Sequence, residues 1–153
     1  MKRRTAVTLC LAMALIMGIC LIGFCTSPKE AYEDTGLKAE LYAAAYHNMI
    51  EYFDSRGEIS NNYVFAVSDL MLDDETYTIF AAEMKNAYGM DVGLTDHHNT
   101  PENTYVAEFQ IYSVSRPNII YTRLYGMENE RWLRQKYRYS SKSGWVLENI
   151  HFD

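Results

Sequence analysis

Imidazole and carboxylate side chains gather in one polar stretch, Asp96-His97-His98-Asn99. Such groups are ligands that zinc and nickel accept. Two adjacent histidines can bind one metal ion only where a loop folds around the ion. Asp91 and Glu102 could bind the same ion only if that loop brought them to it. We therefore interpret the stretch as a solvated loop and predict neither a metal site nor a cofactor.

The residues for covalent or acid–base catalysis are sparse. No cysteine follows Cys25, which excludes a thiol nucleophile, a disulfide framework and cysteine-ligated zinc in the remainder. No nucleophile-elbow sequence accompanies the histidines. His47 is expected on the charged face of a helix, and His151 lies two residues from the end of the chain. These residue types do not exclude an enzyme, but they favour a non-catalytic domain.

Four acidic residues lie close together in the sequence, namely Asp69, Asp73, Asp74 and Glu75. A calcium loop needs oxygen ligands at alternate positions around a glycine, and that pattern is absent from the sequence here. Asp73 is instead a good N-cap and Glu75 suits a helix N-terminus. We assign the cluster to helix capping.

Basic residues recur at every second position near the C-terminus, after Arg131: Arg134, Lys136 and Arg138. Their spacing places these three on one face of a strand. One interpretation is a solvent face with Glu108 or Glu148 as cross-strand partners. The alternative is a docking surface for an anionic partner, either lipid headgroups or an acidic protein.

Tyrosine is unusually frequent, with 13 residues, all beyond position 25. Aromatic rings fill the interior of a curled sheet, and their polar atoms then need partners. Alternatively, an aromatic face binds a peptide, a glycan or a small apolar ligand. The candidate residues for such a face are Tyr105, Tyr121, Tyr137, Tyr139 and Trp145.

The N-terminus carries an export or anchoring signal. Lys2, Arg3 and Arg4 precede an uncharged run over residues 5–25. As a helix this run would be about 30 Å long, the thickness of the hydrocarbon core. The preceding positive charges favour a cytoplasmic N-terminus, which puts residues 29–153 outside the membrane.

Three types of signal remain open. The run is longer than a usual signal core, which favours an uncleaved single-pass anchor. It also resembles a bacterial lipoprotein signal with Cys25 as the lipidated residue, but Phe24 stands where a small residue is expected. Simple cleavage is the third alternative, because Gly23 and Cys25 have the small side chains that a signal peptidase requires.

Charge and composition narrow the class of protein. The 153 residues are 48% hydrophobic and 22% charged, which excludes a disordered chain. The net charge is −6, and 11 basic against 20 acidic residues follow Cys25. This balance has the wrong sign for nucleic-acid binding. Residues 1–28 form the signal segment, and 29–153 have the length of one domain.

Apolar residues at three- and four-residue spacing predict helices over 36–56 and 74–88. Asp34 or Thr35 caps the first, and Gly89 ends the second. The segment 63–72 fits either a helix or a strand, and a short helix is favoured. A loop is expected over 90–103.

From Thr104 onward the apolar period becomes two, which indicates strands. A turn is predicted at residues 116–118. The strands expected after it cover 119–125, 132–140 and 145–152. Their short connections predict an antiparallel meander of four or more strands.

Helices followed by a run of strands indicate the α+β class, with N-terminal helices packed on a curled, cone-like antiparallel sheet. This order, closing on Gly144-Trp145-Val146-Leu147, resembles the nuclear-transport-factor-like or SnoaL-like superfamily. The resemblance implies a cone whose mouth holds a small ligand or a partner, and in its enzymes a carboxylate or histidine inside. An anchor before such a domain also resembles assembly-factor subunits of conjugation and secretion machines.

The sequence thus predicts an extracytoplasmic bacterial domain, tethered at the cell membrane, that binds a ligand or a protein at the envelope. A small-molecule enzyme of the cone type and a structural subunit of an envelope complex are the alternatives. An open sheet edge also makes a homodimer an expectation.

Overall fold

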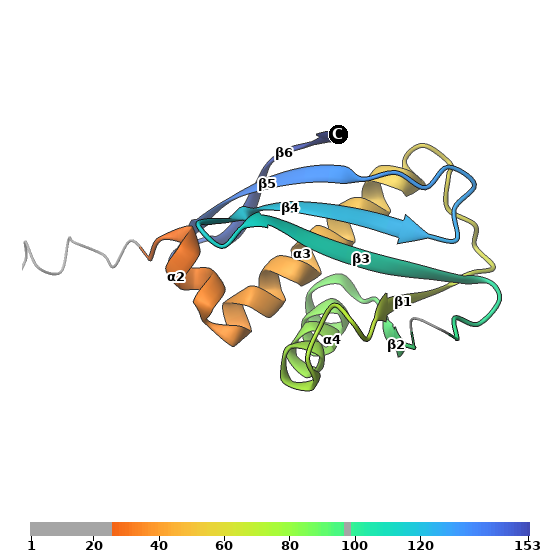
Figure 1. The fold of residues 1–153 in the computed structure, drawn as a ribbon, viewed down its shortest axis with the longest axis horizontal. Helices are drawn as coiled ribbons and strands as arrows, with labels where there is room; N and C mark the ends of the chain where they lie inside the picture. Colours follow the sequence, from red (N-terminus) through yellow and green to blue (C-terminus); the bar gives the residue numbers. More distant parts are fainter. Residues whose placement is uncertain (1–25, 97–98) are drawn as a thin grey trace, which may run out of the picture.

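The computed structural model describes residues 26–96 and 99–153 of the chain (Figure 1). The described helices are α2 (Pro28–Glu33), α3 (Thr35–Asp54) and α4 (Asp74–Tyr88). The strands are β1 (Val64–Ser68), β2 (Gly93–Thr95), β3 (Thr104–Ser113), β4 (Arg116–Tyr125), β5 (Leu133–Ser140) and β6 (Gly144–Phe152). The α+β class is confirmed, with helices packed on one side of a curled sheet.

The six strands form one mixed sheet in the order β2-β1-β3-β4-β5-β6. Strands β3 to β6 are the expected antiparallel meander. Strand β1 lies parallel to both β2 and β3, and α4 forms the crossover from β1 to β2. The sheet is therefore larger than the meander and is not purely antiparallel.

Two local predictions were wrong for related reasons. The favoured helix over 63–72 is instead strand β1, because pairing with β2 and β3 on both sides satisfies its backbone groups. The loop expected over 90–103 contains β2, which pairs with β1. Such short apolar segments fit either state locally, and their sheet neighbours decide between them.

The turn expected at 116–118 lies earlier in the chain. Ser113 pairs with Arg116 across the β3–β4 hairpin, so the chain reverses at Val114 and Ser115. The Ser113 side chain accepts a 3.2 Å hydrogen bond from the Arg116 backbone N–H. Pro117 occupies the second position of β4, near the strand start where proline is tolerated.

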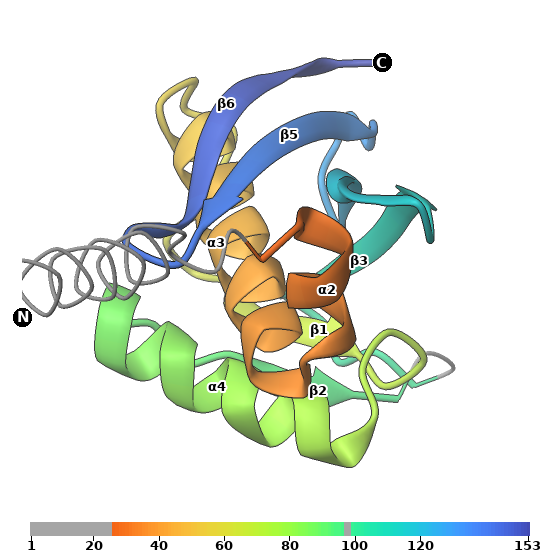
Figure 2. The same ribbon diagram turned by 90° about the vertical axis from the view of Figure 1, so that its left-hand side faces the viewer.

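Helix α3 fills the concave side of the sheet, which curls around it in Figure 2. Tyr46 and Phe53 of α3 are fully buried and share one core with Phe80 of α4 and Tyr137 of β5. Ala43 of α3 is also fully buried, and α4 packs against α3. The interior of the curled sheet is therefore occupied by the protein's own aromatic side chains.

A buried polar network crosses this core. The Gln135 amide donates hydrogen bonds of 2.9 Å to the Ala45 carbonyl oxygen and to the Thr122 hydroxyl. Its oxygen accepts a 2.6 Å bond from the Tyr137 hydroxyl, which accepts a 2.8 Å bond from Asn48. These bonds join α3 to β4 and β5 and satisfy polar groups that would otherwise be costly to bury.

The predicted helix caps are in place. The Asp34 side chain accepts the Leu37 backbone N–H at 2.9 Å, and Asp73 accepts that of Thr76 at 2.8 Å. Gly89 ends α4 in the left-handed conformation. The hydrogen bond from the Thr76 backbone N–H is the largest cause that lowers the pKa of Asp73, as expected for a cap.

Several predicted features fall outside the described residues: the signal segment 5–25, the lipidation candidate Cys25, and the histidine pair at 97 and 98. Within the described part of the chain, no helix combines the length and the apolar character needed to cross a bilayer.

Candidate functional site

The five aromatic candidates do not share one surface. Strand register places Tyr137 and Tyr139 on the helix-facing side of β5, and Trp145 opposite Tyr139 on β6. Tyr121 pairs with Arg134 and faces the opposite, convex side. Tyr105 lies near the start of β3, stacked on Tyr63 with ring centroids 4.2 Å apart.

Tyr105 and Tyr137 are core residues. Tyr137 is only 1% exposed, and its hydroxyl is used by Gln135 and Asn48. Tyr105 is also buried, and its hydroxyl accepts the Ser60 backbone N–H at 3.1 Å. Burial raises the pKa of Tyr137 well above its ordinary value. In this structure neither ring is available to a ligand.

Trp145, by contrast, lines an open groove, and Tyr139 contacts the Trp145 ring. Their rings are 4.9 Å apart, and the Trp145 indole N–H donates a 2.7 Å bond to the Leu37 carbonyl oxygen. This bond fixes the β5–β6 hairpin to the first turn of α3. The groove beside it has a volume of about 190 Å³ and is lined by Glu40, Ala44, Glu83, Tyr88, Ser143, Gly144 and Trp145.

Two half-buried carboxylates, Glu40 of α3 and Glu83 of α4, face this groove. Neither has an ion pair or hydrogen bond with any side chain in the described ranges 26–96 and 99–153. Burial is the largest cause of a raised pKa at Glu40, followed by the charges of Glu83 and Asp34. The groove therefore holds negative charge that the described residues leave uncompensated.

Tyr88 forms a second aromatic wall of the groove, and His47 stacks on it with ring centroids 4.2 Å apart. The His47 Nδ1 atom is buried and has no hydrogen-bond partner among the described residues. Its Nε2 atom lies 3.9 Å from a carboxylate oxygen of Glu51. His47 is thus half-buried support for the groove wall, not the solvated surface residue expected from the sequence.

The size and the charge of the groove limit what it can bind. Pockets for drug-sized molecules have volumes of about 300–1,000 Å³, so a groove of about 190 Å³ fits a single functional group. Carboxylates between aromatic rings favour a cation such as an ammonium or guanidinium. No group of three or more potential metal ligands is present in the described part of the chain.

The four basic candidates divide into two groups. Arg131 makes two hydrogen bonds to Glu58, at 2.7 and 2.9 Å, and lies 4.1 Å above the Phe152 ring. It therefore fastens the loop after α3 to β6. The other three lie on the convex face of β5, which no described helix covers (Figure 1).

On that face, Lys136 and Arg138 share one carboxylate, Glu148, at 3.0 and 3.8 Å. Glu148 is one of the two partners expected from the sequence; the other, Glu108, is engaged by Arg123 at 2.7 Å. Arg134 has no ion pair within 26–96 or 99–153. Beside it, Tyr121 lines a hollow of about 340 Å³ with Gln110, Trp132 and Asp153.

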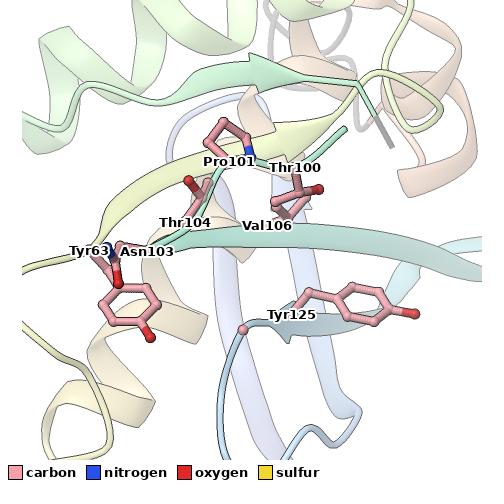
Figure 3. Close-up of a pocket in the computed structure, with 8 residues that line it drawn as sticks. Tyr63, Thr100, Pro101, Asn103, Thr104, Val106 and Tyr125 are labelled. Carbon is pink, nitrogen blue, oxygen red and sulfur yellow. The ribbon is translucent and has the colours of Figure 1, made fainter. Parts of the chain in front are cut away.

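A larger hollow of about 490 Å³ lies at the far end of the sheet (Figure 3). Its walls come from the loop after β2, the start of β3 and the end of β4, with Tyr63 and Tyr125 among the lining residues. None of its lining residues carries a charge. The smaller groove is the stronger candidate because it concentrates uncompensated charge.

Comparison of this chain with protein-family models, with curated proteins and with solved structures finds no match. The candidate site accordingly depends on its own geometry.

Of the residues that line the groove, sequence reasoning identified Trp145 but missed Glu40, Glu83 and Tyr88. The spacing of Glu40 and His47, seven residues apart, places both on one helix face and is a signal available in the sequence. That signal was interpreted as a solvated face. Only the packing of α4 on α3 brings Glu83 and Tyr88 to the same place.

Proposed function

We propose that this chain is a non-catalytic binding domain of the bacterial cell envelope, tethered by its N-terminal apolar segment. Its groove between α3, α4 and the β5–β6 hairpin receives a single cationic group of a peptide or a small amine. The observation that carries the proposal is the pair of half-buried carboxylates, Glu40 and Glu83, without a cation among the described residues.

The rest of the fold supports binding at this groove. The long helix enclosed by a curled sheet supports the resemblance to the nuclear-transport-factor-like cone, whose mouth is where members hold ligands or partners. Here α3 and its aromatic residues occupy the concave interior. Binding is therefore expected at the rim of the cone, where Trp145 and Tyr88 form the walls.

The test compares ligands that differ in charge alone. The full-length chain, purified in a mild detergent, is titrated by calorimetry with N-acetyl-arginine amide, N-acetyl-lysine amide and the neutral isostere N-acetyl-citrulline amide. We expect saturable binding of one or both cationic probes and none of the neutral one. Equal binding of the citrulline probe would contradict the proposal.

Matched variants locate the binding. A charged hydrogen bond contributes about 1.5–3 kcal/mol, so Glu40→Gln or Glu83→Gln should weaken binding about tenfold to a hundredfold. Glu128→Gln is the control, because Glu128 is exposed in the β4–β5 turn. If all three variants bind equally, the groove is not the site.

A second function is favoured by the convex face. Three cations of β5 lie there with one paired carboxylate, Glu148, which contacts Lys136 and Arg138, on a sheet surface that no described helix covers. This supports a structural subunit that docks an acidic surface, either of another envelope protein or of a second copy of the chain. Charge reversal at Arg134 and Arg138 is the test, developed in the Discussion.

A further inference from the structure

The tip of the β3–β4 hairpin exposes apolar side chains to an unusual extent. Tyr112, near the end of β3, is 53% exposed, and Val114, the first residue of the turn, is 68% exposed. The Arg116 guanidinium lies 5.9 Å from the centroid of the Tyr112 ring. Tyrosine with a neighbouring basic residue is typical of a segment at a membrane–water interface.

This tip lies at the end of the domain where the chain enters it. Figures 1 and 2 both place α2, the first described helix, beside the β3–β4 turn. The uncharged run in the sequence stops at Cys25, and α2 begins at Pro28. Three residues span at most about 10 Å, so an anchor in that run would hold this end of the domain close to the bilayer.

The two ends of the meander differ in charge. The turn sequence Tyr112-Ser-Val-Ser-Arg116 contains a cation and no carboxylate, and Lys142 is the one charged residue of the β5–β6 turn. Both turns lie at the α2 end in Figure 1. The β4–β5 turn at the other end contains Glu128 and Glu130, and its one cation, Arg131, pairs with Glu58. The acids of α2 are partly engaged, because Glu33 pairs with Lys29 and Glu30 caps the helix at Ser27.

We infer that Tyr112 and Val114 rest in the interfacial layer of the same bilayer that holds the N-terminal segment, with Arg116 at the lipid phosphates. The inference rests on the tether included in the proposed function. It goes further because it fixes which end of the domain meets the lipid. In this orientation, neither the convex face nor the groove points directly away from the membrane.

The experiment places a reporter at the tip. The full-length chain with Val114→Trp is reconstituted into vesicles of phosphatidylcholine and phosphatidylglycerol, with and without brominated acyl chains that quench indole emission. Wild-type protein in the same vesicles supplies the signal of Trp132 and Trp145. Glu128→Trp, in the turn at the other end of β4, is the matched control.

We expect the emission added by Val114→Trp to shift to shorter wavelength and to be lost in brominated vesicles, while that added by Glu128→Trp is retained. Retention of both, or loss of both, overturns the inference. A carbonate wash of the vesicles tests the N-terminal membrane anchor separately from the hairpin contact. If the chain stays in the vesicles but the Val114→Trp emission is not quenched, only the hairpin contact fails; if the wash releases the chain, the tether fails as well.

Discussion

Replacing Tyr137 by phenylalanine tests whether this residue is part of the core network or of a ligand surface. The substitution keeps the ring and removes one hydroxyl, which donates to Gln135 at 2.6 Å and accepts from Asn48 at 2.8 Å. Gln135 is fully buried, so its oxygen loses its donor without access to water. Asn48 is half-buried and regains part of its loss from solvent.

The expected cost follows from these two environments. An orphaned buried acceptor costs about 1–3 kcal/mol, and a half-buried donor costs less, so the free energy of unfolding should fall by about 2–3 kcal/mol. Unfolding entropy near the midpoint is about 2.1 cal/mol/K per residue, or roughly 0.26 kcal/mol/K for a domain of this size. The melting temperature should therefore fall by about 8–12 °C.

The assay is thermal unfolding of the full-length chain in detergent, followed by near-ultraviolet circular dichroism. The control is Tyr139→Phe, which removes a hydroxyl two residues away on the same strand face. That hydroxyl has no hydrogen bond within the described ranges, so a change below about 0.5 kcal/mol is expected. Asn48→Ala, combined with Tyr137→Phe, gives the coupling energy between the two residues.

Two results would refute this reasoning. One is a Tyr137→Phe variant as stable as Tyr139→Phe, which would mean that the network contributes nothing. The other is a variant of unchanged stability that loses binding of a cationic probe, which would make Tyr137 a ligand residue.

The remaining predictions concern the groove, one backbone turn and the convex face. Because burial raises the pKa of Glu40, the folded state holds the Glu40 proton more tightly than the unfolded chain does, and the contribution of Glu40 to stability falls as the pH rises from 4.5 through the raised pKa. Glu40→Gln should therefore raise the melting temperature at pH 7, and a gain equally large at pH 4 would contradict this. Gly126 has φ of 94°, and an added Cβ would lie 2.8 Å from the Thr104 carbonyl oxygen. Gly126→Ala should therefore lower the free energy of unfolding, measured in urea, by about 2–3 kcal/mol. An unchanged urea midpoint would show that the turn relaxes without cost. If the convex face docks a partner, Arg134→Glu with Arg138→Glu should reduce the sedimentation coefficient of the detergent-extracted complex to that of the monomer, while Lys142→Glu should leave it unchanged.

Much of the fold was accessible from residue patterns. Helix α4 and its caps at Asp73 and Gly89 were predicted to the residue, because an amphipathic stripe between two strong capping signals is a local property. The meander from β3 to β6 was likewise evident from a period of two broken by turns. Segment 63–72 was misassigned because its apolar residues fit both periods, and only parallel pairing with β2 and β3 makes it a strand.

The aromatic candidates show the same division. Composition identified tyrosine as the unusual residue, and alternation placed Tyr137 and Tyr139 correctly on one face of β5. Alternation does not determine whether a face meets solvent or another element. Tyr137 is covered almost entirely, while Trp145 lines the groove beside α3.

The sequence alone determined the α+β class, the order of most elements, the caps, and the basic stripe on one face of β5, because each depends on residues a few positions apart. The tertiary structure alone decided that the concave interior is filled, and it alone brought Glu83 of α4 to Glu40 of α3 across 43 positions. Charge on a helix face is a solvated surface or a binding groove according to what packs beside it. That neighbour comes from a distant part of the chain, so no local pattern contains it.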